Sequence, residues 1–422
     1  MVQLLTSPVI FAFVVFDMTF MPMFHIGGIH GIPYKLCYLI LILFFALFVY
    51  ERRKVFGIKL WRQLSVLFLL VILLSWIGGF RHNLYFGEAT YSETIRNTLI
   101  CLLVPMGLLY GMSQKRENLN FIIPFIFIYL FLNIMITFFF ADLQWMLKFY
   151  YLEGRVEEGL FFIRSPGLFY NPNVSSLVMN ILYLSFVVGL RNKCITYKSK
   201  SIYPMIIITV FSLHFLTASR SEFIAAILIT SFLIYYMVEN EIGFNNKMAS
   251  ILRLISITAV ILIAFFSIFL GQLVERYSVV EIGIDSIASS FTAEKFLDKN
   301  TPDNSLFRPL SKTDLVLKRF FFSPIFGSGF DGSPTSPGGL RYHNDWFDIL
   351  VATGIIGFFL YLLIVRFSIV NAGLVMVVPF LLPALTNSFM YAPQSFVLYF
   401  VILGYAIRMN ALNKNGLLQS KK

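Results

Sequence analysis

The sequence predicts an all-α, polytopic membrane protein, and three observations support this fold class. The chain has 422 residues and is 58% hydrophobic and only 13% charged, whereas a soluble domain carries about 25% charged residues. Its apolar runs continue for about 17 or more residues, which is the length of a transmembrane helix. A transmembrane β-barrel would instead show alternating segments of about 10 residues. These features exclude a cytosolic enzyme, a disordered chain and a disulfide-stapled secreted domain.

About twelve apolar segments are predicted to form transmembrane helices within a single domain, 1–422. The first segment has no basic region before it and no small-residue cleavage site after it, so we expect a retained helix and not a signal peptide. The segments, in chain order, are 4–24, 34–50, 63–80, 95–110, 120–141, 174–190, 202–216, 222–238, 254–274, 346–365, 369–389 and 395–407.

The distribution of Lys and Arg predicts the orientation of these helices. The net charge of +11 does not indicate nucleic-acid binding, because the basic residues are concentrated in short loops and not on a soluble domain. Short loops on one side of the membrane carry a clear excess of Lys and Arg, and such loops are cytoplasmic. We therefore expect both termini to be cytoplasmic.

Two longer segments are expected on the opposite, external side. One is 142–173, and the other is 275–345, between the predicted ninth and tenth helices. Within the second, 323–339 is rich in Gly, Pro and Ser and is predicted to be a turn-rich loop. Residues 306–322 predict a short amphipathic helix along the membrane surface, with simple packing as the alternative role.

Several kinds of site have no supporting pattern. The sequence contains no Walker motif, and the Gly-Ser-Gly at 327–329 is not a dinucleotide-binding fingerprint. The histidines and acids lack metal-ligand spacing, and Cys37, Cys101 and Cys194 do not suggest a disulfide framework. We therefore expect no cofactor and no metal.

Arginines near the external ends of the predicted helices suggest an anion site. Arg164 precedes one helix, Arg220 lies in a very short connection, and Arg341 lies before the tenth helix. A single arginine at such a depth snorkels or pairs with an acid such as Glu222 or Asp345. Three from separate segments favour a cleft that binds a lipid diphosphate, because guanidinium groups bind phosphate oxygens bidentately. Weaker candidates are Arg276, Arg308 and Arg319, which would mainly steer an anion to the site, together with the acids Glu222 and Asp345.

His343 is the candidate general base. A neutral imidazole accepts a proton near neutral pH, and Asp345 or Asp348 could orient the ring. The alternative is that His343 caps a helix or packs in the core. Asp17 and His214 lie in apolar segments, and we expect both to pair inside the helical bundle.

Four strings, in this order, resemble the bacterial O-antigen ligase and polysaccharide polymerase superfamily. Arg164 and the Asn-Pro-Asn at 171–173 resemble its Arg and Asn-Pro-Asn segment, and TASRSEF at 217–223 resembles its Ser-Arg motif. PIFGSG at 324–329 resembles its Pro-x-x-Gly-x-Gly motif. RYHNDWFDILVATGIIG at 341–357 resembles its His-Asn and Thr-Gly-x-x-Gly signature. In this chain Ser221 and Glu222 stand where small residues are usual, which leaves the role of Glu222 open.

The resemblance implies a GT-C-like membrane glycosyltransferase of the bacterial inner membrane that works at the periplasmic face. Such enzymes are metal-independent and inverting and take an undecaprenyl-diphosphate-linked glycan as donor. By the resemblance, Arg164 and Arg220 hold the donor diphosphate and His343 deprotonates the acceptor hydroxyl.

The acceptor is the point that the resemblance leaves open. We favour a polymerase, whose acceptor is another lipid-linked repeat unit and whose partners could include a chain-length regulator. The alternative within the superfamily is a ligase, whose acceptor is lipid A-core. An alternative from another class is a membrane transporter, although the two halves of the chain lack matching broken helices.

Overall fold

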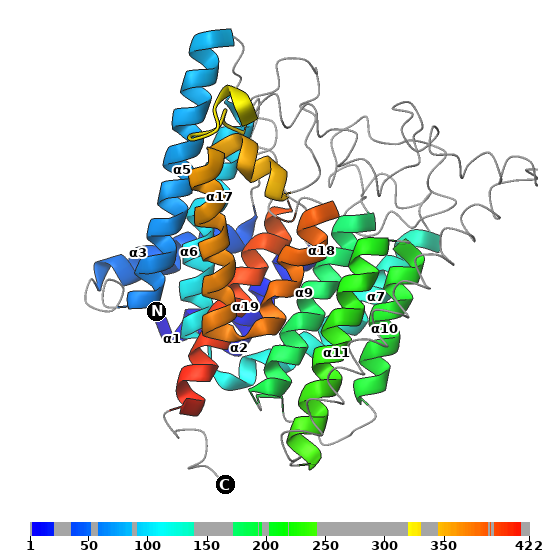
Figure 1. Cartoon of the computed structure of the whole chain (residues 1–422). Helices are drawn as coiled ribbons and strands as arrows, with labels where there is room; N and C mark the ends of the chain where they lie inside the picture. The colour runs from blue at the N-terminus through cyan, green and yellow to red at the C-terminus, as the bar shows by residue number, and fades with distance from the viewer. Residues whose placement is uncertain are drawn as a thin grey trace, which may run out of the picture.

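The protein is a bundle of helices, seen here in a computed structural model (Figure 1). The structure describes residues 2–20, 35–51, 58–86, 91–138, 172–192, 194–195, 202–217, 219–242, 320–330, 345–386, 389 and 392–414. Every regular element within these residues is a helix, which confirms the all-α prediction. The helices are α1 (Val2–Leu5), α2 (Pro8–Phe20), α3 (Leu36–Tyr50), α5 (Lys59–Phe86), α6 (Ser92–Ser113), η1 (Arg116–Phe121), α7 (Ile122–Phe138), α9 (Pro172–Arg191), α10 (Ile202–Thr217), α11 (Arg220–Ile242), α17 (Asp345–Ala372), η2 (Leu374–Val377), α18 (Val378–Thr386) and α19 (Pro393–Lys414).

Six of the described helices are long and apolar enough to cross a membrane. They lie at Lys59–Leu84, Thr94–Ser113, Arg116–Met135, Asn173–Arg191, Asp345–Ala372 and Pro393–Leu412. Shorter apolar helices lie at Pro8–Phe20, Leu36–Tyr50, Ile202–Thr217 and Ser221–Met237. The protein is therefore a multi-pass membrane protein. Of the predicted segments, 254–274 lies outside the described residues, as do nearly all of 142–173 and most of 275–345.

Helices α9 and α19 form the centre of the bundle. Almost every side chain between Ser175 and Val188 in α9 is buried, and so is nearly all of α19 up to Ile407. The closest packing is between α19 and α6, where Gly107 and Gly111 form a Gly-x-x-x-Gly pattern facing α19. A Cβ at Gly107 would lie 3.3 Å from the Val397 carbonyl oxygen. Small residues thus let the two backbones approach, which is how membrane helices associate tightly.

The prediction of one transmembrane helix over 369–389 was wrong. Helix α17 continues to Ala372 and stops at Gly373, whose φ is +106°. The guanidinium of Arg191, at the end of α9, donates to the Ala372 carbonyl and so caps this helix end, where a cation is favourable. The chain then continues through η2 into α18, whose nine residues span only about 14 Å at 1.5 Å per residue. A helix this short cannot cross a hydrocarbon core of about 30 Å.

Asp17 pairs inside the bundle, as predicted. Its carboxylate accepts a hydrogen bond from the Cys37 backbone N–H at 2.9 Å and so caps the start of α3. In return, the Lys35 ammonium donates to the Asp17 carbonyl oxygen at 2.7 Å, at the end of α2. The two side chains therefore satisfy the backbone groups of facing helix ends.

Candidate active site

The starts of α9, α11, α17 and α19 lie at the same end of the bundle, which we call the motif end (Figure 1). The segments that resemble the family motifs lead into three of these helices. Arg220 is the first residue of α11, with its side chain outside the described part, while Glu222 and Asp345 are described. Outside the described residues lie Arg164, Arg276, Arg308, Arg319, Arg341 and His343. The structure thus locates the helices that carry the motifs but not most of the predicted site side chains.

A buried polar network joins the start of α11 to its neighbours. Glu222 is fully buried, and its Oε2 accepts a hydrogen bond from Asn180 Nδ2 at 2.9 Å. The same amide nitrogen lies 2.8 Å from the Glu222 backbone oxygen. On its other side, Asn180 Oδ1 lies 3.0 Å from His214 Nε2. The network therefore links α9, α10 and α11 through one asparagine.

The hydrogen-bond geometry assigns a structural role to two of these residues. Because the Asn180 NH₂ group faces Glu222, its oxygen must accept, so His214 donates from Nε2. His214 is 1% exposed, and its prediction as a paired bundle residue is confirmed. Glu222, whose role the sequence left open, fixes the first turn of α11 to the middle of α9.

Two of the motif segments are in direct contact. Ser219, the residue before α11, donates from its hydroxyl to the Asn173 side-chain oxygen at 3.0 Å. Asn173 belongs to the Asn-Pro-Asn string, and Pro172 is the first residue of α9, where proline is favourable. One turn further in, the Ser176 and Thr217 hydroxyls lie 2.5 Å apart. The structure therefore brings the Ser-Arg motif and the Asn-Pro-Asn motif together at the motif end.

The Thr-Gly-x-x-Gly motif is a break in α17. Gly354 has φ +66° and ψ −169°, a conformation that is strongly unfavourable for residues other than glycine. The break divides α17 into an initial segment, 345–353, and a long second segment. The first free amide of the second segment, Ile355 N–H, donates to the Pro324 carbonyl at 2.8 Å.

The Pro-x-x-Gly-x-Gly motif closes this break. The carbonyls of Val351 and Ala352 lose their helical partners at the break and need other donors. Ser328 N–H donates to the Val351 oxygen at 2.8 Å, and Gly329 N–H donates to the Ala352 oxygen at 2.9 Å. We call residues 324–329 together with 351–355 the glycine clasp. Of the segment 323–339 that was predicted to be turn-rich, residues 323–330 form bends, turns and irregular chain, and 331–339 lie outside the described residues.

Helix α5 completes the glycine clasp from a distant part of the sequence. A Cβ at Gly78 would lie 2.7 Å from the Gly329 nitrogen and 3.0 Å from the Ala352 oxygen. A Cβ at Gly329 would lie 2.6 Å from the Gly79 Cα. Three backbones therefore meet where only glycine fits. The sequence reasoning missed this contact, and the Gly-Gly pair inside an apolar segment is the signal that could have indicated it.

The initial segment of α17 is anchored to α18 as well as to the clasp. Trp346 Nε1 donates to the Phe380 carbonyl at 3.0 Å, and the indole packs edge-on against Tyr361 at 5.3 Å. Asp345 is fully buried and Asp348 is 6% exposed, both in a first helical turn, where acidic residues are favourable. Helix α11 also packs against α18. Both motif helices, α11 and α17, therefore rest on the same short helix.

Among the described residues, no group of three His, Cys, Asp or Glu side chains is arranged to hold a metal ion. In this part of the chain the Asn180 amide bonds to both Glu222 and His214. The motif end therefore contains several fixed helix starts, and the motif residues lie next to these starts in the sequence.

These features define a multi-pass membrane protein whose motif segments meet at one end of a helical bundle. Residues 205–362 match the family model described as O-antigen ligase. Over these residues the chain is similar to the O-antigen ligase family, and this match supports the resemblance of its motifs to the O-antigen ligase and polysaccharide polymerase superfamily. The matched range covers most of α10, all of α11, the glycine clasp and most of α17. A search of curated proteins finds no match to the chain.

Proposed function

We propose that the protein is a surface-polysaccharide polymerase with a GT-C-like fold. It transfers a glycan from undecaprenyl diphosphate to another lipid-linked repeat unit at the periplasmic face of the bacterial inner membrane. In this proposal both termini are cytoplasmic and the motif end is periplasmic. The observation that carries the proposal is the Ser219–Asn173 contact, because it joins the helix start at Arg220 to the segment that follows Arg164.

The arginines act on the leaving group. When the acceptor hydroxyl oxygen attacks the anomeric carbon, the carbon–oxygen bond to phosphate breaks and the diphosphate leaves with the electron pair. Arg164, Arg220 and Arg341 stabilise this charge, which in a site without a metal needs cationic hydrogen-bond donors. Arg276, Arg308 and Arg319 lie in the same external segment and attract the anionic donor.

His343 acts on the acceptor. Its neutral imidazole takes the proton from the attacking hydroxyl, and attack from the face opposite the diphosphate inverts the anomeric configuration. The support is indirect: the segment that follows His343 begins with buried Asp345 and is fixed by the clasp. A group held at such a helix start is well positioned for general-base catalysis, because productive geometry depends on rigid support.

A ligase is the second candidate, because the matched family model carries the description O-antigen ligase. The two enzymes share the donor, the leaving group and the proposed arginines and differ in the acceptor. A ligase would transfer the glycan to lipid A-core.

The decisive experiment is an in vitro reaction of the purified protein with an undecaprenyl-diphosphate-linked repeat unit. Polymerase activity gives a ladder of longer lipid-linked products from this substrate alone. Product that appears only after lipid A-core is added identifies a ligase. A protein that is folded and consumes neither acceptor would contradict the glycosyltransferase proposal and favour the transporter.

A further inference from the structure

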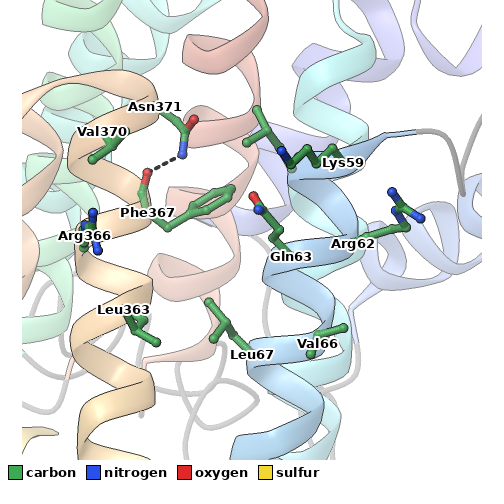
Figure 2. Close-up of a pocket in the computed structure, with 11 residues that line it drawn as sticks. Lys59, Arg62, Gln63, Val66, Leu67, Leu363, Arg366, Phe367, Val370 and Asn371 are labelled. Carbon is green, nitrogen blue, oxygen red and sulfur yellow. Dashed lines mark hydrogen bonds between the residues drawn. The ribbon is translucent and has the colours of Figure 1, made fainter.

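An open groove lies between the first half of α5 and the last half of α17, at the end of the bundle opposite the motif end. The glycine clasp holds the two helices together near Gly78, and the groove lies where they have separated. It has a volume of about 810 Å³. Figure 2 shows the Phe367 ring and the Gln63 amide projecting into the space between the helices.

The walls of the groove are apolar and open to the surroundings. Val66 is 54% exposed, Leu363 is 43% exposed and Val370 is 70% exposed. In a membrane protein such side chains face hydrocarbon. The ring of Phe367 closes the back of the groove and is itself 8% exposed. An acyl chain laid along these side chains would cover them.

The groove carries cations and no acid. Lys59, Arg62 and Arg366 are exposed and line it, and none of its lining residues is Asp or Glu. Within the described part of the chain, none of these three side chains makes an ion pair or hydrogen bond. Figure 2 shows Arg62 on the side of α5 that faces away from α17, and Arg366 on the side of α17 that faces away from α5, so that the two cations flank the groove.

The predicted orientation of the helices accounts for cations at this end of the bundle, because this end is predicted to be cytoplasmic. It does not account for their placement around an apolar groove. The Gln63 side chain is also exposed and makes no hydrogen bond among the described residues. Cations around an apolar cleft between helices, on the cytoplasmic side, form the pattern that binds anionic lipid headgroups.

We propose that this groove binds an anionic diacyl phospholipid of the inner leaflet. The headgroup phosphate lies at the opening of the groove, where the long, exposed side chains of Arg366 and of Arg62 or Lys59 turn toward it, and one acyl chain lies along Phe367 and Leu363. The bound lipid bridges α5 and α17 at the end opposite the glycine clasp and so holds both ends of this helix pair. The inference rests on the proposed orientation, which places this end on the cytoplasmic side, but not on the proposed transfer reaction.

The test measures the thermal unfolding midpoint of the full-length protein in neutral detergent. The detergent is supplemented with phosphatidylglycerol, phosphatidylcholine or inorganic phosphate. We expect phosphatidylglycerol alone to raise the midpoint markedly, with an affinity about fivefold tighter for each cation that contacts it. Replacing Arg62 and Arg366 together by Gln should remove most of this preference. Lys115→Gln is the matched control, because Lys115 is an exposed cation outside the groove.

Three outcomes would overturn the proposal. They are equal stabilisation by both lipids, an effect of inorganic phosphate equal to that of phosphatidylglycerol, or a Lys115→Gln variant as impaired as the double variant. If the double variant does not fold, Leu363→Trp provides a second measurement in an otherwise unchanged protein. Its fluorescence should be quenched more strongly by brominated phosphatidylglycerol than by brominated phosphatidylcholine, and equal quenching would contradict the proposal.

Discussion

Adjacent glycines in α5 should respond in opposite ways to the same substitution. A methyl group at Gly78 would lie 2.7 Å from the Gly329 nitrogen and 3.0 Å from the Ala352 oxygen. Both are backbone atoms of the glycine clasp and cannot rotate away. A methyl group at Gly79 would meet nothing closer than the Tyr91 ring, at 3.7 Å, which is an ordinary contact. Both positions are helical, so Gly78→Ala and Gly79→Ala share the same gain in helix propensity.

The expected magnitudes follow from these two terms. Overpacking costs about 1–3 kcal/mol, and replacing glycine by alanine in a helix gains about 0.5–1 kcal/mol. Gly78→Ala should therefore lose about 1–2 kcal/mol of stability, while Gly79→Ala should be neutral or slightly stabilised. The measurement is the thermal unfolding midpoint of each purified variant in the same detergent. Because the propensity term cancels, the difference between the variants reports the clasp alone.

The reasoning would be refuted by equal midpoints for the two variants, or by a Gly79→Ala protein less stable than Gly78→Ala. Either result would mean that α5 does not approach the loop at 324–329 as closely as the structure has it. A second effect should accompany the first. Because the clasp fixes the start of α17, Gly78→Ala should also lower transferase activity below the wild-type rate at temperatures where it remains folded.

Three further predictions test the polar network, the diphosphate site and the orientation. Glu222→Gln should keep its bond to Asn180 and retain stability and activity, whereas Glu222→Ala should lose about 1–3 kcal/mol; equal unfolding midpoints for the two variants would contradict the structural role. Arg220→Ala should lose more activity than Arg220→Lys, because Lys keeps the positive charge but cannot make the bidentate hydrogen bonds of a guanidinium group. A fully active, normally expressed Arg220→Ala variant would show that this residue is not part of the site. Asp303→Cys should react with an impermeant maleimide in cells whose outer membrane is permeable. The native Cys194 should not be labelled under these conditions, because burial raises the pKa of its thiol and so slows its reaction. No labelling of Asp303→Cys would reverse the orientation.

The apolar runs predicted most of the helices because a membrane imposes a length that is readable from composition. The segment 369–389 was the exception. Its composition is that of a helix that crosses the membrane, but Gly373 has a positive φ and Arg191 caps Ala372. Arg191 is distant in sequence, so the point at which α17 ends depends on a tertiary contact that hydropathy does not contain.

In the candidate site, too, some features could be predicted from the sequence and others could not. The motif strings could be recognised one by one, and the pairing of His214 inside the bundle could be expected from the cost of a polar group in an apolar segment. The contact of Ser219 with Asn173, and the approach of Gly78 to Gly329, are between residues far apart in the chain. The role of Glu222 could not be read locally, because its spacing from Ser219 fits a helix capping box while its side chain bonds to Asn180 in α9.

The central claim is that His343 removes a proton from the acceptor during transfer from a lipid diphosphate. The most direct measurement is the pH dependence of kcat/KM for the wild type and His343→Gln with the same lipid-linked substrate. The account predicts that the wild-type value falls as pH decreases through the imidazole pKa, which is about 6.5 when unperturbed, because only the neutral ring accepts a proton. His343→Gln should lose about 10²–10⁴-fold in rate and also lose this dependence. A wild-type rate that rises as pH falls, or a variant as active as the wild type, would contradict the account.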